Sequence, residues 1–485
     1  MPARQEIKEF LDSYQDELTE NLQELIQYKS VKGEPEEGRP FGPEIGECLI
    51  RILEMADVMG MKTSNLEGYA GTVEIGEGEE MLGILCHLDV VPAGNDWEYD
   101  PFAGVIEEGR IYGRGTLDNK GPAVASLYAM KTILDLEIKL NKRVRLILGT
   151  NEESGWKGID YYNKNAEVPT LAFSPDAVFP VIHAEKGILV FDLLKEYSTD
   201  GNDYQAEEKE PSTRGRVKVK SISGGNAPNM VPDRASALVI GERKYLQEKI
   251  AEYQSDYPED IKLKTINSEK SEILVKGISA HGSLPADGVN AVSHLICLLA
   301  EMNLTSGNIE SFIKTYQKLI GTDYYGENIG CNVCDEVSGQ LVFNVGQIEV
   351  DEKEARITVN IRYPVSYQSE EIFRGLTDKI SKFNWLLERK EHKAPLYVEK
   401  DDRLVESLMQ VYRDETGDEK AKPIAIGGGT YARAVPRGVA FGPLFPGQPE
   451  LAHQKNEFIE IENLMLNALI YVRAIIELAA EEKIN

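Results

Sequence analysis

The stretch that most constrains the fold is the apolar run Met81-Leu-Gly-Ile-Leu-Cys-His-Leu-Asp89. A continuous apolar run of this length is typical of a buried strand in an α/β sheet. Such a strand would end at His87 and Asp89, at the edge where these sheets build ligand sites. Because residues two apart on a strand share a face, the Asp89 carboxylate could orient the His87 imidazole. A histidine placed there can bind a metal, and it can equally be a hydrogen-bonded core residue.

The size and charge of the chain limit its class. A chain of 485 residues is too long for a single core, so two domains are expected. The net charge of −28 argues against a nucleic-acid partner, because binding to phosphates needs clustered Lys and Arg. The sequence shows neither a signal peptide nor an apolar run long enough to span a membrane. We therefore expect a protein that binds neither nucleic acid nor membrane.

The cysteines indicate a reducing compartment. Five cysteines form an odd and sparse set, which does not suit a disulfide framework, so a cytoplasmic location is predicted. Cys331-Asn-Val-Cys334 has the spacing of a metal knuckle or a redox pair. It lacks a second cysteine pair and the strand–helix–strand context of a redox site, and we assign it no function.

Acidic residues follow two further predicted strands. Arg143–Thr150 is an apolar strand that ends in Glu152 and Glu153, and the strand Leu171–Phe173 runs into Asp176. Adjacent carboxylates at one strand end are usually solvated charges, and the repetition at successive strand ends is what suggests a site. Histidine and carboxylates without thiolates suit Zn²⁺, Mn²⁺ or Co²⁺.

Asp118 stands in a glycine-rich turn before the predicted helix Pro122–Leu136. Glycines allow the backbone of such a turn to adopt strained geometry, so the carboxylate could be directed inward. The alternative is that Asp118 only caps the helix. Upstream, residues 5–29 have helical apolar spacing and Pro43–Met59 predicts a second amphipathic helix.

Residues 187–393 differ from the rest of the chain. Short strands alternate there with helices, which predicts an inserted α+β domain with an antiparallel sheet. Its polar segment Ser198–Thr213 is expected to be a surface loop. His281, between Ala280 and Gly282, leaves room for a ligand to approach. The expected domain boundaries place residues 1–186 and 394–485 in one domain and residues 187–393 in the insertion.

The last part contains the turn Gly427-Gly-Gly-Thr430-Tyr431-Ala-Arg433, which is expected to open a helix. Backbone N–H groups in such a turn can bind an anion. The turn lacks the Gly-Lys-Ser/Thr ending of a nucleotide loop, so a carboxylate ligand is favoured over a phosphate. Arg433 could alternatively do no more than bond the turn. A further strand, Val439–Phe445, leads to His453.

Taken in order, these motifs resemble a known family. They are His87-Leu-Asp89-Val-Val-Pro92, Gly113-Arg-Gly-Thr-Leu-Asp118-Asn-Lys-Gly121, Glu152-Glu153-Ser-Gly, Ser174-Pro-Asp176, His281-Gly and the late His453. This constellation resembles the dinuclear metallopeptidase family of aminoacylases, carboxypeptidase G-type enzymes and bacterial dipeptidases. Length, insertion, Asn229-Met-Val-Pro232 and the Gly427–Arg433 turn are most similar to its PepV-type dipeptidase branch. The resemblance implies an α/β metallopeptidase domain with helices on both faces of a mixed sheet, plus an inserted α+β lid domain.

The resemblance also implies roles for individual residues. His87 and Asp176 would bind one divalent ion, Glu153 and His453 the other, and Asp118 would bridge the two. The ions would be zinc, with manganese or cobalt as alternatives. The remaining roles by position are as follows: Glu152 is the general base, Asp89 orients His87, the Asp118–Asn119 peptide bond is cis, His281 is an oxyanion donor, and Asn229, Arg362, Gly428, Gly429, Thr430, Tyr431 and Arg433 bind substrate.

The implied reaction is hydrolysis of unblocked dipeptides through a metal-bridging hydroxide. The alternative within the enzyme class is an N-acyl amino acid deacylase of the desuccinylase or aminoacylase type, because the same site can split any suitably placed amide. A non-catalytic binding protein would require the loss of a ligand or of Glu152, and all are present. Shorter family members dimerise through a lid about half this size, so a lid of this length predicts a functional monomer.

Overall fold

The computed structural model describes residues 2–197, 216–257 and 260–481, which form two compact units. The first unit comprises residues 1–184, 396–425 and 429–485, and the second comprises 185–395 and 426–428. The predicted lid, 187–393, lies within the second unit. The polar segment Ser198–Thr213 that was expected to be a loop lies outside the described residues. In the described part of the chain, no helix is long and apolar enough to cross a membrane.

In the described residues, the first unit is built on a mixed, nine-stranded sheet. Its strands, in spatial order, are β1 (Lys62–Leu66), β2 (Ala70–Ile75), β6 (Arg143–Gly149), β3 (Met81–His87), β7 (Leu171–Ser174), β22 (Gly438–Phe441), β9 (Val181–Glu185) and β20 (Leu396–Tyr397), with β21 (Ile424–Ile426) paired to β9. The central strands β6, β3 and β7 are parallel, and β2 pairs with β6 in the antiparallel direction. The sheet is therefore mixed, as predicted.

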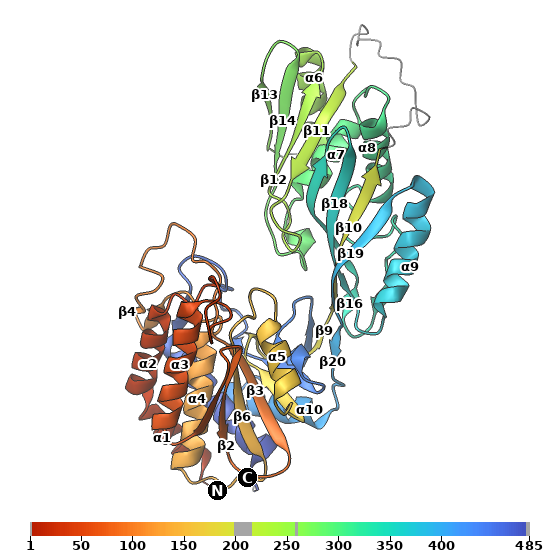
Figure 1. Ribbon diagram of the computed structural model, residues 1–485. Helices are drawn as coiled ribbons and strands as arrows, with labels where there is room; N and C mark the ends of the chain where they lie inside the picture. Colours follow the sequence, from red (N-terminus) through yellow and green to blue (C-terminus); the bar gives the residue numbers. More distant parts are fainter. Residues whose placement is uncertain (1, 198–215, 258–259, 482–485) are drawn as a thin grey trace. The chain divides into compact units, whose positions relative to one another are not determined.

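Helices cover both faces of this sheet, as predicted (Figure 1). The helices are α1 (Arg4–Asp12), α2 (Gln15–Gln27), α3 (Pro43–Val58), α4 (Lys120–Asp135), α5 (Lys157–Asn165), α10 (Arg403–Thr416) and α11 (Ile461–Ala479). On one face Ile84 and Cys86 join the core made with α1 to α4, α10 and α11, and on the other Leu85 and Ile147 pack with α5. This alternation along β3 explains why the strand is apolar throughout.

The local sequence explains where several helices begin and end. Pro43 occupies the first turn of α3, where its missing N–H costs nothing. The Asp402 side chain caps α10, and Gly417 ends it with a φ of 74°. Residues 5–29 form two helices rather than one. The break lies at Ser13, whose hydroxyl donates to the Phe10 carbonyl and competes with the helical pattern.

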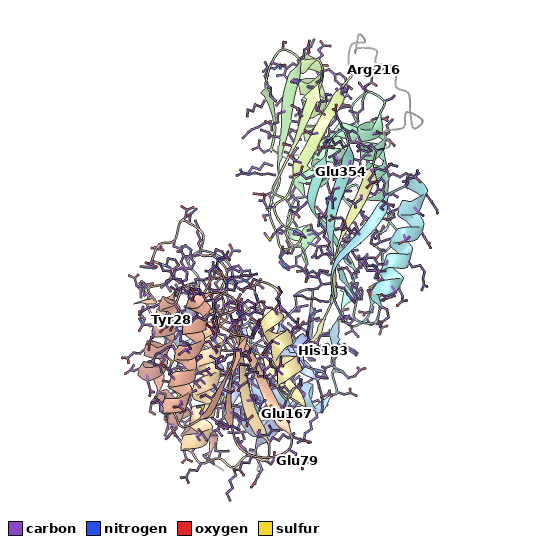
Figure 2. The ribbon with its side chains drawn as sticks, in the orientation of Figure 1. Tyr28, Glu79, Glu167, His183, Arg216 and Glu354 are labelled. Carbon is purple, nitrogen blue, oxygen red and sulfur yellow. The ribbon has the colours of Figure 1, made fainter. Side chains whose placement is uncertain are left out.

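Two small sheets border the first unit's main sheet. One contains β4 (Val105–Glu107), β5 (Arg110–Tyr112) and β24 (Phe458–Glu460), and the other pairs β8 (Ala177–Val178) with β23 (Pro443–Leu444). The chain leaves the first unit just after His183 of β9 (Figure 2). The Nδ1 atom of His183 lies 2.7 Å from the Val398 carbonyl, so this histidine forms a hydrogen bond within the first unit.

Within the described residues, the second unit contains an eight-stranded sheet that is antiparallel throughout, as predicted for the lid. Its spatial order is β13 (Asp260–Thr265), β14 (Lys270–Lys276), β12 (Arg234–Ile240), β11 (Lys218–Gly224), β17 (Val342–Val350), β18 (Glu354–Tyr363), β10 (Gly187–Glu196) and β19 (Leu386–Lys393). Four helices pack on one face of it: α6 (Arg243–Asp256), α7 (Ala291–Ala300), α8 (Asn308–Leu319) and α9 (Ser369–Ile380). Short elements complete the unit: η1 (Pro285–Asp287), η2 (Ser381–Phe383), β15 (Cys334–Asp335) and β16 (Gly339–Gln340).

The strand order of the second unit repeats itself about the middle of its sheet. Along the chain, the elements β11, β12, α6 and β13 follow one another in the same order as β17, β18, α9 and β19. In the sheet, β14 lies between β12 and β13, and β10 lies in the equivalent position between β18 and β19. The two halves meet where β11 pairs with β17, from Ile222 opposite Val350 to Gly224 opposite Ile348. One chain therefore supplies both halves of this sheet.

Candidate metal centre

Three parallel strands deliver acidic and histidine side chains to one edge of the first unit's sheet. In the register of β3 and β6, His87 lies opposite Gly149, and β7 runs parallel to β3 on its other side. Glu152 and Glu153 follow β6 by a few residues, and Asp176 follows β7. The carboxyl ends of parallel strands meet at the same edge, which explains why residues far apart in sequence converge here.

Asp118 occupies the centre of the cluster, because its carboxylate lies between two imidazoles. Its Oδ1 is 2.9 Å from His87 Nε2, and its Oδ2 is 3.0 Å from His453 Nε2. Each imidazole has a second carboxylate partner. Asp176 Oδ1 is 3.4 Å from His87 Nε2, and Glu153 Oε1 is 2.9 Å from His453 Nε2. The cluster thus consists of two halves that share Asp118.

This donor set fits a pair of divalent ions. Ligand atoms of His87, Asp118 and Glu153 lie within 4.8 Å of one another. Each half of the cluster offers one imidazole nitrogen and carboxylate oxygens, which are the donors that Zn²⁺, Mn²⁺ and Co²⁺ take in proteins. The five residues that the sequence suggested as ligands are therefore brought together, and their roles as ligands stay predictions.

The electrostatics of the cluster also favour bound cations. Burial, followed by the negative charge of Asp176, raises the pKa of Glu152 well above its usual range. Burial lowers the pKa of His453, but its hydrogen bonds with Asp118 and Glu153 outweigh that effect and bring the value to about 11. Both shifts favour the protonated forms of Glu152 and His453, so metal binding at this cluster would release protons.

Asp89 acts differently from the expectation. The Nδ1 atom of His87 lies 2.9 Å from the main-chain oxygen of Asp89, and the Asp89 carboxylate is farther away, at 3.6 Å. The two carboxylate oxygens instead accept the backbone N–H groups of Glu152 and Glu153, each at 3.0 Å. Asp89 therefore orients the imidazole through its backbone and fixes the glutamate turn through its side chain.

The loop that carries Asp118 is held by a residue that the sequence did not single out. Glu457 is fully buried, and its Oε1 accepts the backbone N–H groups of Gly115, Leu117 and Asp118 at 2.9 to 3.3 Å. Its Oε2 lies 2.5 Å from the guanidinium of Arg114. These partners are about 340 residues apart in the chain, so no local spacing could have indicated them.

Asn119 links two of the strand ends. Its side-chain amide donates to the Pro175 carbonyl at 2.7 Å and to Asp176 Oδ1 at 3.0 Å, and its oxygen accepts the backbone N–H of His87 at 3.3 Å. The peptide bond between Asp118 and Asn119 is cis, which confirms the prediction for this position. The amide thus connects the loops that carry three of the candidate ligands.

The glycine-rich turn differs from the prediction. The expected helix is wrong, because Tyr431–Ala434 forms a 3-10 turn of four residues. So short an element provides no helix dipole for an anion. Thr430 Oγ1 accepts the Ala432 N–H at 3.2 Å, and the Tyr431 ring is fully buried. Roles of Gly428, Gly429, Thr430, Tyr431 and Arg433 in binding substrate stay predictions.

The remaining candidate residues belong to the second unit. His281 is exposed, and its Nδ1 lies 2.6 Å from Ser283 Oγ. Asn229 accepts the Gly282 N–H through its carbonyl at 2.7 Å. Arg362 is buried and donates to Asn360 Oδ1 at 2.9 Å and to the Gly427 carbonyl at 3.0 Å. Arg362 therefore fastens the start of the glycine-rich turn, and its contact with substrate stays a prediction.

Known proteins are similar to this chain in sequence and in fold. Residues 83–477 match the peptidase family M20/M25/M40. The chain belongs to this family. Two bacterial relatives are both named "Putative dipeptidase". YtjP of Bacillus subtilis is 39% identical, with 96% of this chain and 97% of the relative covered. SH1171 of Staphylococcus haemolyticus is 36% identical, with 98% of this chain and 99% of the relative covered. The family resemblance drawn from the motifs is thereby confirmed.

Two solved structures of dipeptidases share the fold at low sequence identity. Human carnosine dipeptidase 1 superimposes with a TM-score of 0.55 at 16% identity, covering 98% of this chain and 99% of its own. The di-peptidase Dug1p of Saccharomyces cerevisiae gives a TM-score of 0.54 at 13% identity, with 96% and 97% covered. These likenesses confirm the architecture of a catalytic domain with an inserted lid.

We expect His453→Ala and Glu153→Ala each to lower zinc affinity by roughly a hundredfold or more, since loss of even an outer partner of a metal ligand costs 10–100-fold. Isothermal titration of the metal-free protein with zinc measures this directly. His392→Ala is the control, because His392 is exposed on β19 and bonds Tyr363 at 2.8 Å. Unchanged zinc affinity in either variant would remove that residue from the ligand set.

Proposed function

We propose that this M20 enzyme is a metal-dependent dipeptidase that hydrolyses the peptide bond of unblocked dipeptides with two divalent ions bound per chain. The observation that carries the proposal is the placement of Asp118 between His87 and His453, each with a further carboxylate. Support comes from relatives that carry the dipeptidase name and align with nearly the whole chain. Zinc is the proposed ion, with manganese or cobalt as alternatives.

His87, Asp118, Glu153, Asp176 and His453 would hold the two ions, and the ions would supply Lewis acidity that lowers the pKa of a water molecule and polarises the scissile carbonyl. Glu152 takes the proton of that water and passes it to the leaving amine, acting as base and then as acid. Asp89 holds the backbone of Glu152 while this happens. His281 donates an N–H to the oxygen that becomes negative as the carbonyl is attacked.

We also propose that the protein works as a monomer in the cytoplasm on small peptides. The monomer proposal is supported by the repeat within the lid sheet, where β11 and β17 pair with each other. In a lid of half this size, β11 would be an edge strand, and its unpaired backbone groups could pair with a strand of another subunit. The cytoplasmic location is supported by the five cysteines, which are all unpaired.

The function is tested with a panel of free dipeptides, the same dipeptides blocked at the amino or carboxyl end, N-succinyl and N-acetyl amino acids, and hexapeptides. We expect free dipeptides to be hydrolysed with the highest kcat/KM. Blocking either end should lower kcat and raise KM, because contacts with both ends position the scissile bond. Faster cleavage of the N-acylated amino acids would establish a deacylase instead. Hexapeptides cleaved as fast as dipeptides would contradict the proposal.

The assembly is tested by light scattering combined with activity measured over serial dilution. We expect a single species at the chain mass of 54.1 kDa and a specific activity that does not change on dilution. The reason is that both halves of the lid come from one chain. A dimer that loses its activity when it dissociates would show that the monomer proposal is wrong.

A further inference from the structure

The backbone of the turn that carries Glu152 is fixed from several sides. Asp89 accepts the N–H groups of Glu152 and Glu153, and the Trp156 N–H donates to the Asn151 carbonyl at 2.8 Å. The Asn151 side chain also accepts the Lys157 N–H at 3.0 Å. With the backbone held in this way, the direction of the Glu152 carboxylate depends on the rotation of its own side chain.

A single indole group contacts that carboxylate. The Nε1–H of Trp156 donates to Glu152 Oε1 at 2.9 Å. An indole N–H can donate but cannot accept, so it favours the charged carboxylate and never competes for its proton. Because the indole engages Oε1, proton transfer would use the other oxygen, Oε2.

The indole is itself held in place. Trp156 begins α5 with a φ of 62°, and its ring packs edge-on against Tyr431 with centroids 5.2 Å apart. Tyr431 is fully buried, lies against Gly149, and packs edge-on against His87 at 6.1 Å. The side chains of His87, Tyr431, Trp156 and Glu152 therefore form a continuous series that connects a candidate metal ligand with the candidate base.

We propose that Trp156 is a positioning residue for Glu152. The indole N–H holds the carboxylate in one rotamer and keeps Oε2 directed to the reacting water. This inference rests on the proposed function, in which Glu152 is the base. Rigid support of this kind matters because a catalytic group must be held within a fraction of an ångström of its productive geometry. The competing interpretation is that Trp156 only packs against Tyr431.

Trp156→Phe separates the two interpretations, because it keeps an aromatic ring and removes the N–H. We expect kcat to fall about ten- to a hundredfold, the range for loss of one hydrogen bond to a charged group. KM should stay within about twofold and zinc content should not change. Trp97→Phe is the matched control, since it removes an indole N–H that donates to the Ala93 carbonyl at 2.7 Å.

A double-mutant cycle then assigns the effect to Glu152. In a Glu152→Ala background, measured in single turnovers with excess enzyme, Trp156→Phe should cause no further loss, because the group it positions is gone. An equal loss in both backgrounds would show that Trp156 acts on the fold or on the metals. An unchanged kcat in the single variant would also overturn the proposal.

The contact can be read without activity. The chain has three tryptophans, so isotope-labelled tryptophan gives three indole N–H resonances in an NMR spectrum. The resonance absent from Trp156→Phe should shift and exchange faster with solvent in Glu152→Ala, while the other two stay in place. A resonance that does not move would disprove the contact. If the wild type hydrolyses no peptide, the proposed function fails together with the catalytic part of this inference, and this resonance still decides the contact.

Discussion

The carboxylate of Asp118 is the group on which the site depends, because it is shared by two imidazoles that come from opposite ends of the chain. Burial alone would raise the pKa of Asp118, but hydrogen bonds from His453 and His87 lower it strongly. For Glu153, burial and the negative charge of Asp118 outweigh the hydrogen bond with His453 and raise its pKa, and burial likewise raises the pKa of Asp89 and Glu152. Charged groups removed from water need opposite charge close by. Two cations astride Asp118 would provide it for all of these groups.

The architecture around Asp118 keeps it in place. The parallel strands β3, β6 and β7 bring their carboxyl ends to one edge, and residues that do not bind metal then fix the loops. Glu457 gathers three backbone N–H groups of the Asp118 loop, and Asn119 joins that loop to the strand ends of His87 and Asp176. The candidate ligands and the residues that support them therefore come from segments that lie far apart in the sequence, and the sheet aligns them.

Much of this could be predicted because it is local. The apolar run before His87 predicted β3, and the same pattern before Glu152 and Asp176 predicted β6 and β7. The antiparallel lid followed from alternating short strands and helices. The motifs in their order then identified the family and the cis bond after Asp118.

What could not be predicted depends on tertiary contacts. Glu457 is one acidic residue among 81, and its role appears only when the loop of Asp118 is folded against it. Trp156 gave no signal, because its hydrogen bond to Glu152 appears only in the folded turn, where Trp156 has a φ of 62°. The prediction of a helix after the glycine-rich turn was wrong. The element there is a single 3-10 turn, because Tyr431 is buried and only a short path leads to β22.

Anomalous diffraction at the zinc absorption edge, from crystals of the zinc-loaded protein, tests the central claim most directly. The account predicts two peaks per chain on opposite sides of the Asp118 carboxylate, one beside His87 and Asp176 and the other beside His453 and Glu153. A single peak, or a pair of peaks that does not share Asp118, would contradict it.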